Sequence, residues 1–288
     1  MKKFTFKLWA VLLLMLVSLQ TFATDNEYGL KDNIQDGVIL HCFDWTYAQI
    51  KEELPNIAAA GFSAVQTSPA HPREPVGAAW YMLYQPYDYK VGENGLGTKE
   101  GLTELCTEAH QYGVKIIVDV VASHTNGSLS YVASFWQDKS LYHDYQGGID
   151  YSNRWQVTHG RLGMWDLKTE DSRVQEKIKE YVAELKSCGV DGIRWDAAKH
   201  IGLPSEGDTF WQNVPDQTMY NYGEILDGTS GDDTVSEKVE VVSQTTGVQL
   251  HPVAGESSAK AMIYNLQGQR VDANYHGVVV CNGRKYVQ

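Results

Sequence analysis

The chain is poor in basic residues and in long apolar runs, and both shortages narrow the classes of protein to which it can belong. It has 24 Lys and Arg against 36 Asp and Glu, which gives a formal net charge of -12 over 288 residues. We expect no nucleic-acid partner, because phosphate contacts need clustered Lys and Arg. After residue 23 no segment approaches the ~18 apolar residues of a transmembrane helix, so no membrane span is predicted.

Cysteines and glycine-rich loops are also scarce. The four cysteines are too few for a disulfide framework and are expected to be mostly buried thiols: Cys42, Cys106, Cys188 and Cys281. No glycine-rich phosphate loop follows the first apolar segment, which disfavours a nucleotide-binding protein. Aromatic residues are plentiful, with 8 Trp, 17 Tyr and 7 Phe. They suffice for sugar-stacking platforms, although any single one is more simply explained by packing in the core.

Residues 1–23 have the pattern of a secretory signal peptide. Lys2 and Lys3 give a positive start, residues 8–19 are apolar except for one serine, and residues 21–23 offer a small-residue cleavage site. The mature protein is therefore expected to be secreted or held at the cell surface.

Apolar strands and amphipathic helices alternate along the next part of the chain. The predicted strands are 37–44, 63–69, 114–121, 190–196 and 220–226, and the predicted helices are 47–60, 96–113 and 168–189. A long polar and aromatic insertion occupies about 124–165. Near-continuous apolar strands separated by helices indicate a parallel sheet with helices outside. The repeated units favour an α/β fold of the (β/α) TIM-barrel type, incomplete at about five units, over a doubly wound sheet.

The first helix has clear boundary signals. Thr46 is a plausible N-cap and Gly61 a stop. Pro55 lies inside this segment and is expected to kink or split it.

The stretch GVDGIRWDAAKH (189–200) places charged residues directly after an apolar strand. Arg194 and Asp196 are two residues apart, so their side chains point to the same face of the strand. Both lie at its carboxyl end, where barrel enzymes carry their chemistry. Arg194 is expected to keep Asp196 ionised. The alternative is a structural ion pair.

Two further strand ends add polar groups to this site. Asp119 and His124 follow the third strand, and Glu224 follows the fifth. Asp196 and Glu224 would form the carboxylate pair of a retaining glycosidase, in which the two groups lie ~5–5.5 Å apart. Glu224 is the better acid, because no basic residue lies near it in sequence to hold it ionised.

At these segments the chain resembles the α-amylases of glycoside hydrolase family 13, closest to the secreted bacterial type. The matching segments span about residues 37–228 and include LHCFDWTYAQIKEEL, WYMLYQPYDYKVGENGLGT, GVKIIVDVVASHTN, RWQVTHGRLGMWDLKTED, GVDGIRWDAAKHIGLP and YGEILDG. The resemblance implies a (β/α)8 barrel with a small domain inserted after strand 3, which matches the insertion at 124–165.

The family's residue roles transfer to matching positions. They imply that Asp196 is the nucleophile, Glu224 the general acid/base and Arg194 the residue that orients the nucleophile. The implied substrate-binding residues are Tyr81, Tyr84, Gln85, His124, Met164, Lys199 and His200. From the residues alone, Tyr81 and Tyr84 equally suit loop packing.

The resemblance also implies a structural calcium ion, held by oxygen ligands. The matching positions are Asp166 and the carbonyl groups of Thr158 and His200. The remaining ligand is usually an asparagine, and Ser123 occupies its position here. Since its hydroxyl has a shorter reach, the site is expected to be weakened. Taken alone, Asp166 is equally a solvated loop acid.

The resemblance ends after Asp227, so the barrel domain is assigned to 24–228. The family continues with three more strands and supplies a third catalytic Asp in a His-Asp pair, but the only His-Asp dipeptide here is His143-Asp144, inside the insertion. Residues 229–288 are interpreted as a linker and a β-rich tail. The tail predicts short strands with turns at 267–268 and 282–283, and it resembles the sorting tails read by export machinery in Bacteroidota. A generic β-rich appendage is the alternative.

Two functions follow from these residues. The first is a retaining hydrolase that cleaves α-1,4-glucosidic bonds in starch or malto-oligosaccharides, with weak activity because the third Asp is missing. The second is a non-catalytic or vestigial glucan-binding protein at the cell surface. A weaker third option is a relative that acts on short oligosaccharides or transfers glucosyl units.

Overall fold

The computed structural model describes residues 26–73, 79–145, 147–225 and four short strands between 263 and 287. The predicted signal peptide, the predicted linker after residue 228 and the predicted turns at 267–268 and 282–283 lie outside the described residues. Among the described residues, no helix combines the length and the apolar character needed to cross a membrane.

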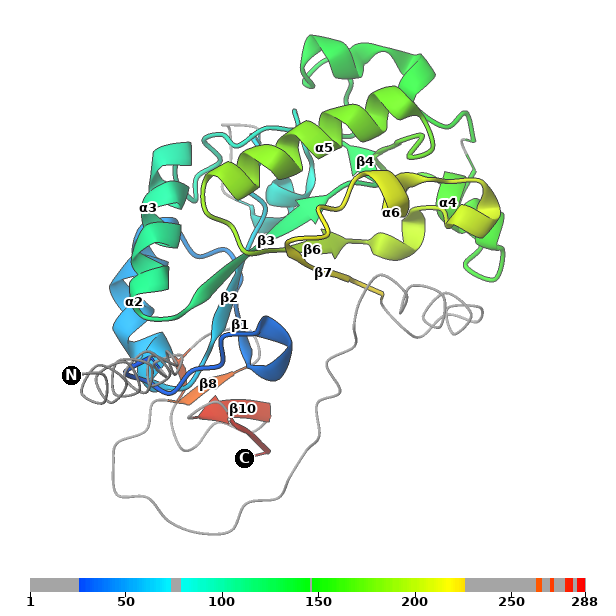
Figure 1. Ribbon diagram of the computed structural model, residues 1–288. Coiled ribbons are helices and arrows are strands. Elements are labelled where there is room, and N and C mark those ends of the chain that lie inside the picture. Colours follow the sequence, from blue (N-terminus) through cyan, green and yellow to red (C-terminus); the bar gives the residue numbers. More distant parts are fainter. Residues whose placement is uncertain are drawn as a thin grey trace, which may run out of the picture.

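A parallel sheet of five strands forms the centre of the structure (Figure 1). Its order is β1-β2-β3-β6-β7, and every neighbouring pair is parallel. The strands are β1 (Ile39–Cys42), β2 (Ala64–Thr67), β3 (Lys115–Val121), β6 (Gly192–Asp196) and β7 (Tyr220–Gly223). Neighbours in the sheet are neighbours in the strand sequence, which is the arrangement of a (β/α) barrel. Five strands make up only part of such a barrel.

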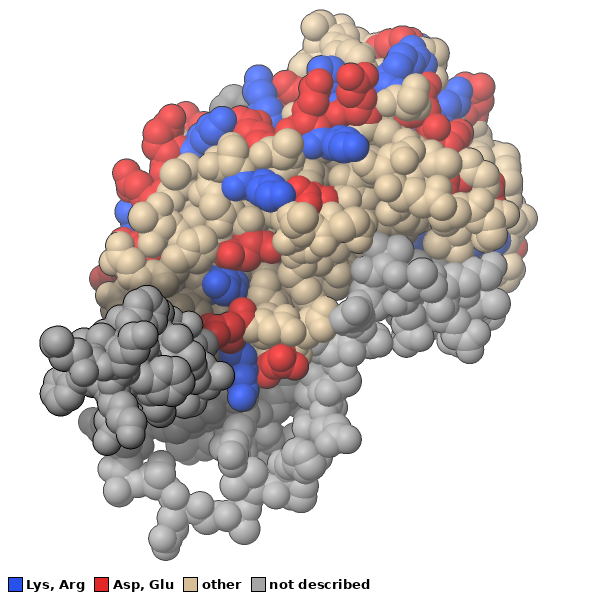
Figure 2. Space-filling model, viewed as in Figure 1, with Lys and Arg blue, Asp and Glu red and all other residues tan. Residues whose placement is uncertain are grey.

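Long helices connect the strands and cover one face of the sheet (Figure 1). They are α2 (Tyr47–Ala59), α3 (Lys99–Gln111) and α5 (Ser172–Ser187). Side chains at alternate strand positions, such as Val65, Val118 and Trp195, belong to one core with helix residues. Charged side chains of both signs gather on the outside, over α3 and α5 (Figure 2).

Helix α2 begins at the predicted cap and ends near the predicted stop. Thr46 accepts a hydrogen bond from the backbone N–H of Gln49, whose side chain accepts one from the Thr46 N–H. Gly61 has φ +87°. Pro55 was expected to kink or split this helix, and a split is excluded, because α2 runs unbroken from residue 47 to 59. Pro55 is exposed, so water can reach the carbonyl that loses its partner.

The opposite face of the sheet is concave and carries a second, smaller apolar cluster. This cluster contains Ile34, Ala64 and Ile117, with Tyr220 and Tyr222 packed against it. The Tyr222 hydroxyl donates a hydrogen bond to the side-chain carbonyl of Gln66, although two strands separate β7 from β2 in the sheet. The sheet is therefore strongly curled, as a barrel wall is.

Short elements make up the insertion and the segment after β6. The insertion contains β4 (His124–Thr125), η3 (Ser134–Gln137), η4 (Lys139–Leu141), α4 (Arg154–His159) and β5 (Trp165–Asp166). After β6 come η5 (Ala198–His200), η6 (Pro204–Glu206) and α6 (Phe210–Asn213), while η1 (Ile34–Asp36) and η2 (Trp80–Tyr84) precede β1 and follow β2. β4 and β5 pair antiparallel and close the insertion at its base.

The C-terminal strands form a separate antiparallel sheet, as the tail pattern predicts. They are β8 (Ile263–Asn265), β9 (Arg270–Val271), β10 (Val278–Cys281) and β11 (Arg284–Val287), in the order β11-β10-β8-β9. In the register of β10 and β11, Cys281 pairs with Arg284. Cys42, Cys106 and Cys188 are buried free thiols, as predicted.

Candidate active site

The concave face carries three carboxylates around one guanidinium group. Asp119 on β3 pairs in register with Arg194 on β6. Asp196 lies two residues further along β6, and Glu224 directly follows β7. Strand alternation turns these side chains to the face opposite the helices. The sequence prediction that Arg194 and Asp196 share one face at a strand end is confirmed.

Arg194 contacts all three carboxylates. Its Nη1 lies 2.6 Å from Asp119 Oδ2 and 2.9 Å from Asp196 Oδ1, and its Nη2 lies 2.5 Å from Glu224 Oε1. Asp196 and Glu224 therefore bind the two amino nitrogens of one guanidinium. This contact brings together the two residues predicted to be catalytic.

Backbone hydrogen bonds fix Glu224 against the turn that follows β6. The Glu224 N–H donates to the Trp195 carbonyl (2.8 Å), and the Glu224 carbonyl accepts from the Ala198 N–H (3.0 Å). The Ala197 N–H donates to Glu224 Oε2 (3.1 Å). Ala197 adopts a left-handed conformation with φ +47°, which costs ~1–2 kcal/mol in a non-glycine residue. The strained turn at Ala197 thus helps to hold the Glu224 carboxylate beside Asp196.

The electrostatics differ from the sequence prediction at both carboxylates. Burial and the neighbouring Asp119 raise the pKa of Asp196, although Arg194 opposes them. The direction of this shift runs against the expectation that Arg194 keeps Asp196 ionised, because burial, its largest cause, outweighs the nearby cation. The expectation that no basic group holds Glu224 is also wrong, since Arg194 reaches it from the next strand.

Residues from the loop after β2 close one side of the cluster. The Tyr84 hydroxyl donates to Asp119 Oδ2 (3.0 Å), and the Tyr84 ring stacks on Phe43. His124 Nε2 lies 3.0 Å from the Tyr84 carbonyl, and burial lowers the pKa of His124 to about 4. Gln85 accepts a hydrogen bond from Asn126. Tyr84 and His124 are thus in contact, and Gln85 lies next to Tyr84 in the chain, while their role in substrate binding stays a prediction.

The predicted substrate residues outside this group are less closely connected. Tyr81 is half exposed on η2, where its ring contacts Trp80. Met164 is partly buried in the insertion, and no described contact links it to the carboxylates.

Lys199 and His200 lie on η5, directly after the turn at Ala197. Lys199 Nζ lies 4.7 Å above the ring of Tyr151. His200 Nδ1 lies 2.7 Å from the Val157 carbonyl, and burial lowers the pKa of His200 to about 4. Both side chains are therefore held by the insertion, on the side of β6 that carries the site.

The residues predicted to bind calcium surround the base of the insertion. Asp166 Oδ2 lies 2.6 Å from His143 Nδ1, and burial raises the pKa of Asp166 to about 7. Ser123 Oγ lies 2.9 Å from His124 Nδ1. Among the described residues, His, Cys, Asp and Glu side chains form no group of three that would hold a metal. A calcium ion would therefore depend on carbonyl groups and one oxygen of Asp166.

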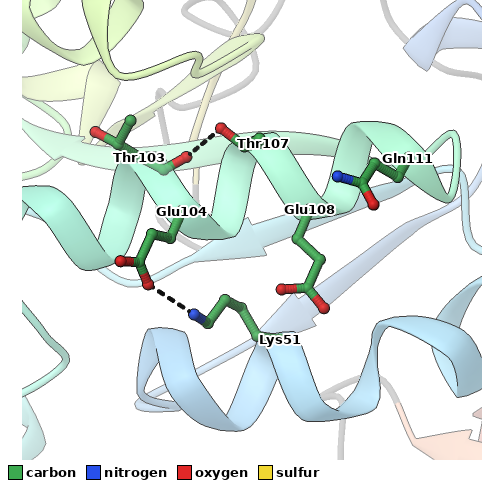
Figure 3. A pocket seen from close by; sticks show the side chains of 6 residues that line it. All are labelled: Lys51, Thr103, Glu104, Thr107, Glu108 and Gln111. Atoms are coloured by element: carbon green, nitrogen blue, oxygen red, sulfur yellow. Dashed lines mark hydrogen bonds and ion pairs between the residues drawn. The ribbon is translucent and has the colours of Figure 1, made fainter.

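A surface hollow lies elsewhere, between α2 and α3 (Figure 3). Lys51 spans it and binds Glu104 at 2.8 Å, while Glu108 points toward the same space. Because both helices cover the outer face of the sheet, this hollow is separate from the carboxylate cluster.

A curled parallel sheet with carboxylates at adjacent strand ends defines the class of the barrel enzymes. Comparison with protein families then identifies the family. The model of the alpha-amylase catalytic domain matches residues 44–278, so the chain belongs to the alpha-amylase family. This match extends beyond residue 228, where the motif resemblance ends.

The chain is similar to several alpha-amylases but covers only part of each. It is 40% identical over 227 residues to an alpha-amylase of Clostridium acetobutylicum and 32% identical over 247 residues to one of Butyrivibrio fibrisolvens. These matches cover 72% of this chain but 30% and 25% of the two relatives.

Solved structures show the same fold. An alpha-amylase from Malbranchea cinnamomea matches with a TM-score of 0.62 at 25% identity and covers 74% of this chain and 52% of its own. A maltohexaose complex of a mutant alpha-amylase I from Eisenia fetida matches with a TM-score of 0.62 at 23% identity, covering 70% of this chain and 48% of its own.

Sequence reasoning missed three residues that shape the site. Asp119 was placed at the end of the third strand but was not predicted to be the buried partner of Arg194. The register between the third and fourth predicted strands would have indicated this contact. The Phe43 ring stacks on the Tyr84 ring, and the Tyr151 ring lies beneath the Lys199 ammonium group. No local pattern marks these two aromatics, because only the tertiary fold brings them to the site.

Proposed function

We propose that the chain is a retaining glycoside hydrolase that acts on α-1,4-glucosidic bonds of starch-like glucans. The observation that carries this proposal is the placement of Asp196 and Glu224 on the two amino nitrogens of Arg194. Membership of the alpha-amylase family supports the substrate class.

The proposed reaction has two steps. The Asp196 carboxylate attacks the anomeric carbon while the glycosidic bond breaks, and Glu224 gives its proton to the leaving oxygen. Glu224 then takes a proton from water, whose oxygen displaces Asp196 from the sugar. Arg194 orients Asp196 and spreads the charge of the cluster.

The resting charge distribution opposes the first step. Burial and Asp119 raise the pKa of Asp196, whereas attack on the sugar needs its carboxylate form, and Arg194 occupies one oxygen of Glu224. The first step therefore requires an ionised Asp196 and a Glu224 carboxyl group that leaves Arg194 to reach the leaving oxygen of the sugar. Together with the missing third Asp, this predicts weak activity, since losing one preorganised electrostatic stabiliser costs ~10²–10³ in rate.

Substrate binding is assigned to the residues around this cluster. We propose that the sugar at the cleavage point contacts His124 and Gln85 and stacks on Tyr84. The leaving-group side of the glucan would then contact Lys199 and His200. Tyr81 and Met164 would contact sugar units further along the glucan.

The second candidate is a non-catalytic glucan-binding protein. The Arg194–Glu224 salt bridge favours it, because this contact occupies an oxygen of the carboxyl group that the first step needs at the leaving oxygen of the sugar. In that case the aromatic loop would still bind sugar while the carboxylates do no chemistry.

Release of reducing sugar from soluble starch separates these functions. The hydrolase predicts release that disappears in Glu224→Gln, while the matched control Glu176→Gln, on the exposed face of α5, keeps it. Binding of amylose without release would support the second candidate. A rate within about tenfold of a full-length amylase, a barrier difference of ~1.4 kcal/mol, would contradict weak activity. Product profiles would detect glucosyl transfer.

We also propose a weak calcium site at the base of the insertion. Asp166 Oδ1 and the carbonyl groups of Thr158 and His200 suit a hard cation, since calcium prefers oxygen ligands. The Ser123 hydroxyl fits less well, because it is hydrogen-bonded to His124. Bound calcium would hold the insertion against the segment after β6.

Export remains a proposal that concerns residues 1–23 and the tail. Secretion or cell-surface attachment would place the chain where starch is found. Recognition of the tail by export machinery predicts that a chain ending at residue 228 stays in the cells, which fractionation and immunoblotting would test.

A further inference from the structure

One exposed aromatic ring in the insertion is set apart from the candidate active site. Among the described residues, the exposed large apolar side chains are Trp80, Tyr81, Tyr131, Phe135 and Trp155. Trp80 and Tyr81 belong to η2 beside the carboxylate cluster. Trp155 lies on α4, and 53% of its surface is exposed.

Neighbouring rings hold Trp155 in place. His159 stacks on one face of the indole, with ring centres 4.6 Å apart and an interplanar angle of 19°. The Tyr145 ring is nearly perpendicular to the indole, with an interplanar angle of 73° and ring centres 5.3 Å apart. The ring centre of His159 in turn lies 4.2 Å from that of His143, which is buried and forms a hydrogen-bonded contact with Asp166. His159 therefore covers one face of the indole, and the 53% exposure of the residue requires that much of the opposite face is open to solvent.

The helix that carries this ring is tied to the segment after β6. The Arg154 guanidinium donates to the carbonyl groups of Lys199 and Ile201 and forms an ion pair with Glu206. Trp155 follows Arg154 directly. The ring is thus anchored to the segment that carries Lys199 and His200, on the proposed leaving-group side.

The surroundings of the ring are polar. Gln156 accepts a hydrogen bond from the Asp150 N–H, and Ser152 donates to the Asp150 carboxylate. A single exposed ring among polar groups is too small an apolar area for a stable protein interface, which buries ~1,200–2,000 Å² in total. A fixed aromatic face suits the C–H groups on one side of a glucose ring, and the polar neighbours suit its hydroxyls.

We propose that Trp155 is the platform of a second glucan-binding site, outside the carboxylate cluster. The ligand is an α-1,4-linked glucan chain that stacks one glucose on the open face of the indole. This inference relies on the proposed function for its choice of sugar. The site keeps a long glucan attached near the leaving-group side between cleavage events.

Starch binding by the full chain tests this proposal. In a Glu224→Gln background, which stops turnover, Trp155→Ala is expected to weaken the apparent Kd for soluble starch about five- to tenfold. Phe135→Ala, which removes another exposed ring, should leave binding unchanged. Trp155→Phe keeps a flat ring and should restore part of the affinity. Circular dichroism and thermal melting establish that the variants are folded.

Two results would overturn the proposal. One is starch binding by Trp155→Ala equal to that of its parent, and the other is a parent chain that does not bind starch. The proposed function fails separately, by absence of reducing-sugar release from the chain with Glu224 intact. Binding that depends on Trp155 without any release would therefore support the second site and contradict the hydrolase.

Discussion

Arg194 on β6 and Glu224 after β7 form an ion pair of 2.5 Å, and the same guanidinium binds Asp119 and Asp196. One cation thus connects three strands of the sheet. Asp119 has no exposed side-chain surface, so its charge depends on this contact. Arg194 is therefore expected to contribute both to the stability of the sheet and to the proposed chemistry of the site.

Arg194→Met is expected to destabilise the protein strongly. Removing the cation leaves buried carboxylates without a partner, which costs ~3–5 kcal/mol in the free energy of unfolding. Urea denaturation would measure this loss. The matched control is Arg173→Met, which removes exposed ion pairs with Asp171 and Asp138 and should cost at most ~1 kcal/mol. Equal losses in the two variants would contradict the central role of Arg194.

The stability of the protein is expected to fall as pH rises because of Asp196. Its pKa is raised from 3.8 to about 8 by burial and by Asp119, so the folded state holds a proton that the unfolded state releases. The contribution of this bound proton to the free energy of unfolding is fully present below pH 3.8 and is lost as pH rises to about 8. Between these values the free energy of unfolding falls by at most ~1.4 kcal/mol per pH unit.

Urea midpoints measured at several pH values in this window test the effect. Asp196→Asn removes the titrating group, so its stability should depend less on pH than that of the parent. An unchanged slope in Asp196→Asn would assign the effect to other groups.

Thr46→Ala is expected to cost about 1 kcal/mol of stability. The Thr46 hydroxyl satisfies the Gln49 N–H at the start of α2, and loss of such a cap costs ~0.5–2 kcal/mol. Thermal melting would measure the change. Thr103→Ala on the exposed face of α3 is the control, since Thr103 donates only to the Lys99 carbonyl within its own helix and should not lower Tm. If both variants melt alike, the cap contributes nothing.

Removal of calcium is expected to lower the melting temperature. A ligand at 100 times its Kd stabilises the folded state by ~2.7 kcal/mol. Excess calcium should therefore raise Tm and a chelator should reverse the rise, which differential scanning calorimetry would detect. Asp166→Asn should remove this response. A Tm that ignores both calcium and chelator in the parent chain would exclude the site.

The fold was more predictable than the arrangement of charges. Apolar strands and amphipathic helices have local patterns, so all five parallel strands and the three long helices lie within a few residues of their predicted positions. The placement of Arg194 and Asp196 on one face of the strand was predictable, because strand alternation is also a local pattern. The Arg194–Glu224 ion pair was missed, because it joins residues 30 positions apart that only the register of β6 and β7 brings together.

The side chains around Arg194 differ in how far water reaches them. Exposure of the side chain rises from 0% at Asp119 to 12% at Asp196 and 27% at Glu224. Water is therefore excluded from the cluster at β3 and reaches it at β7. A solute in the surrounding water therefore meets Glu224 more readily than Asp196, and it cannot touch the Asp119 side chain.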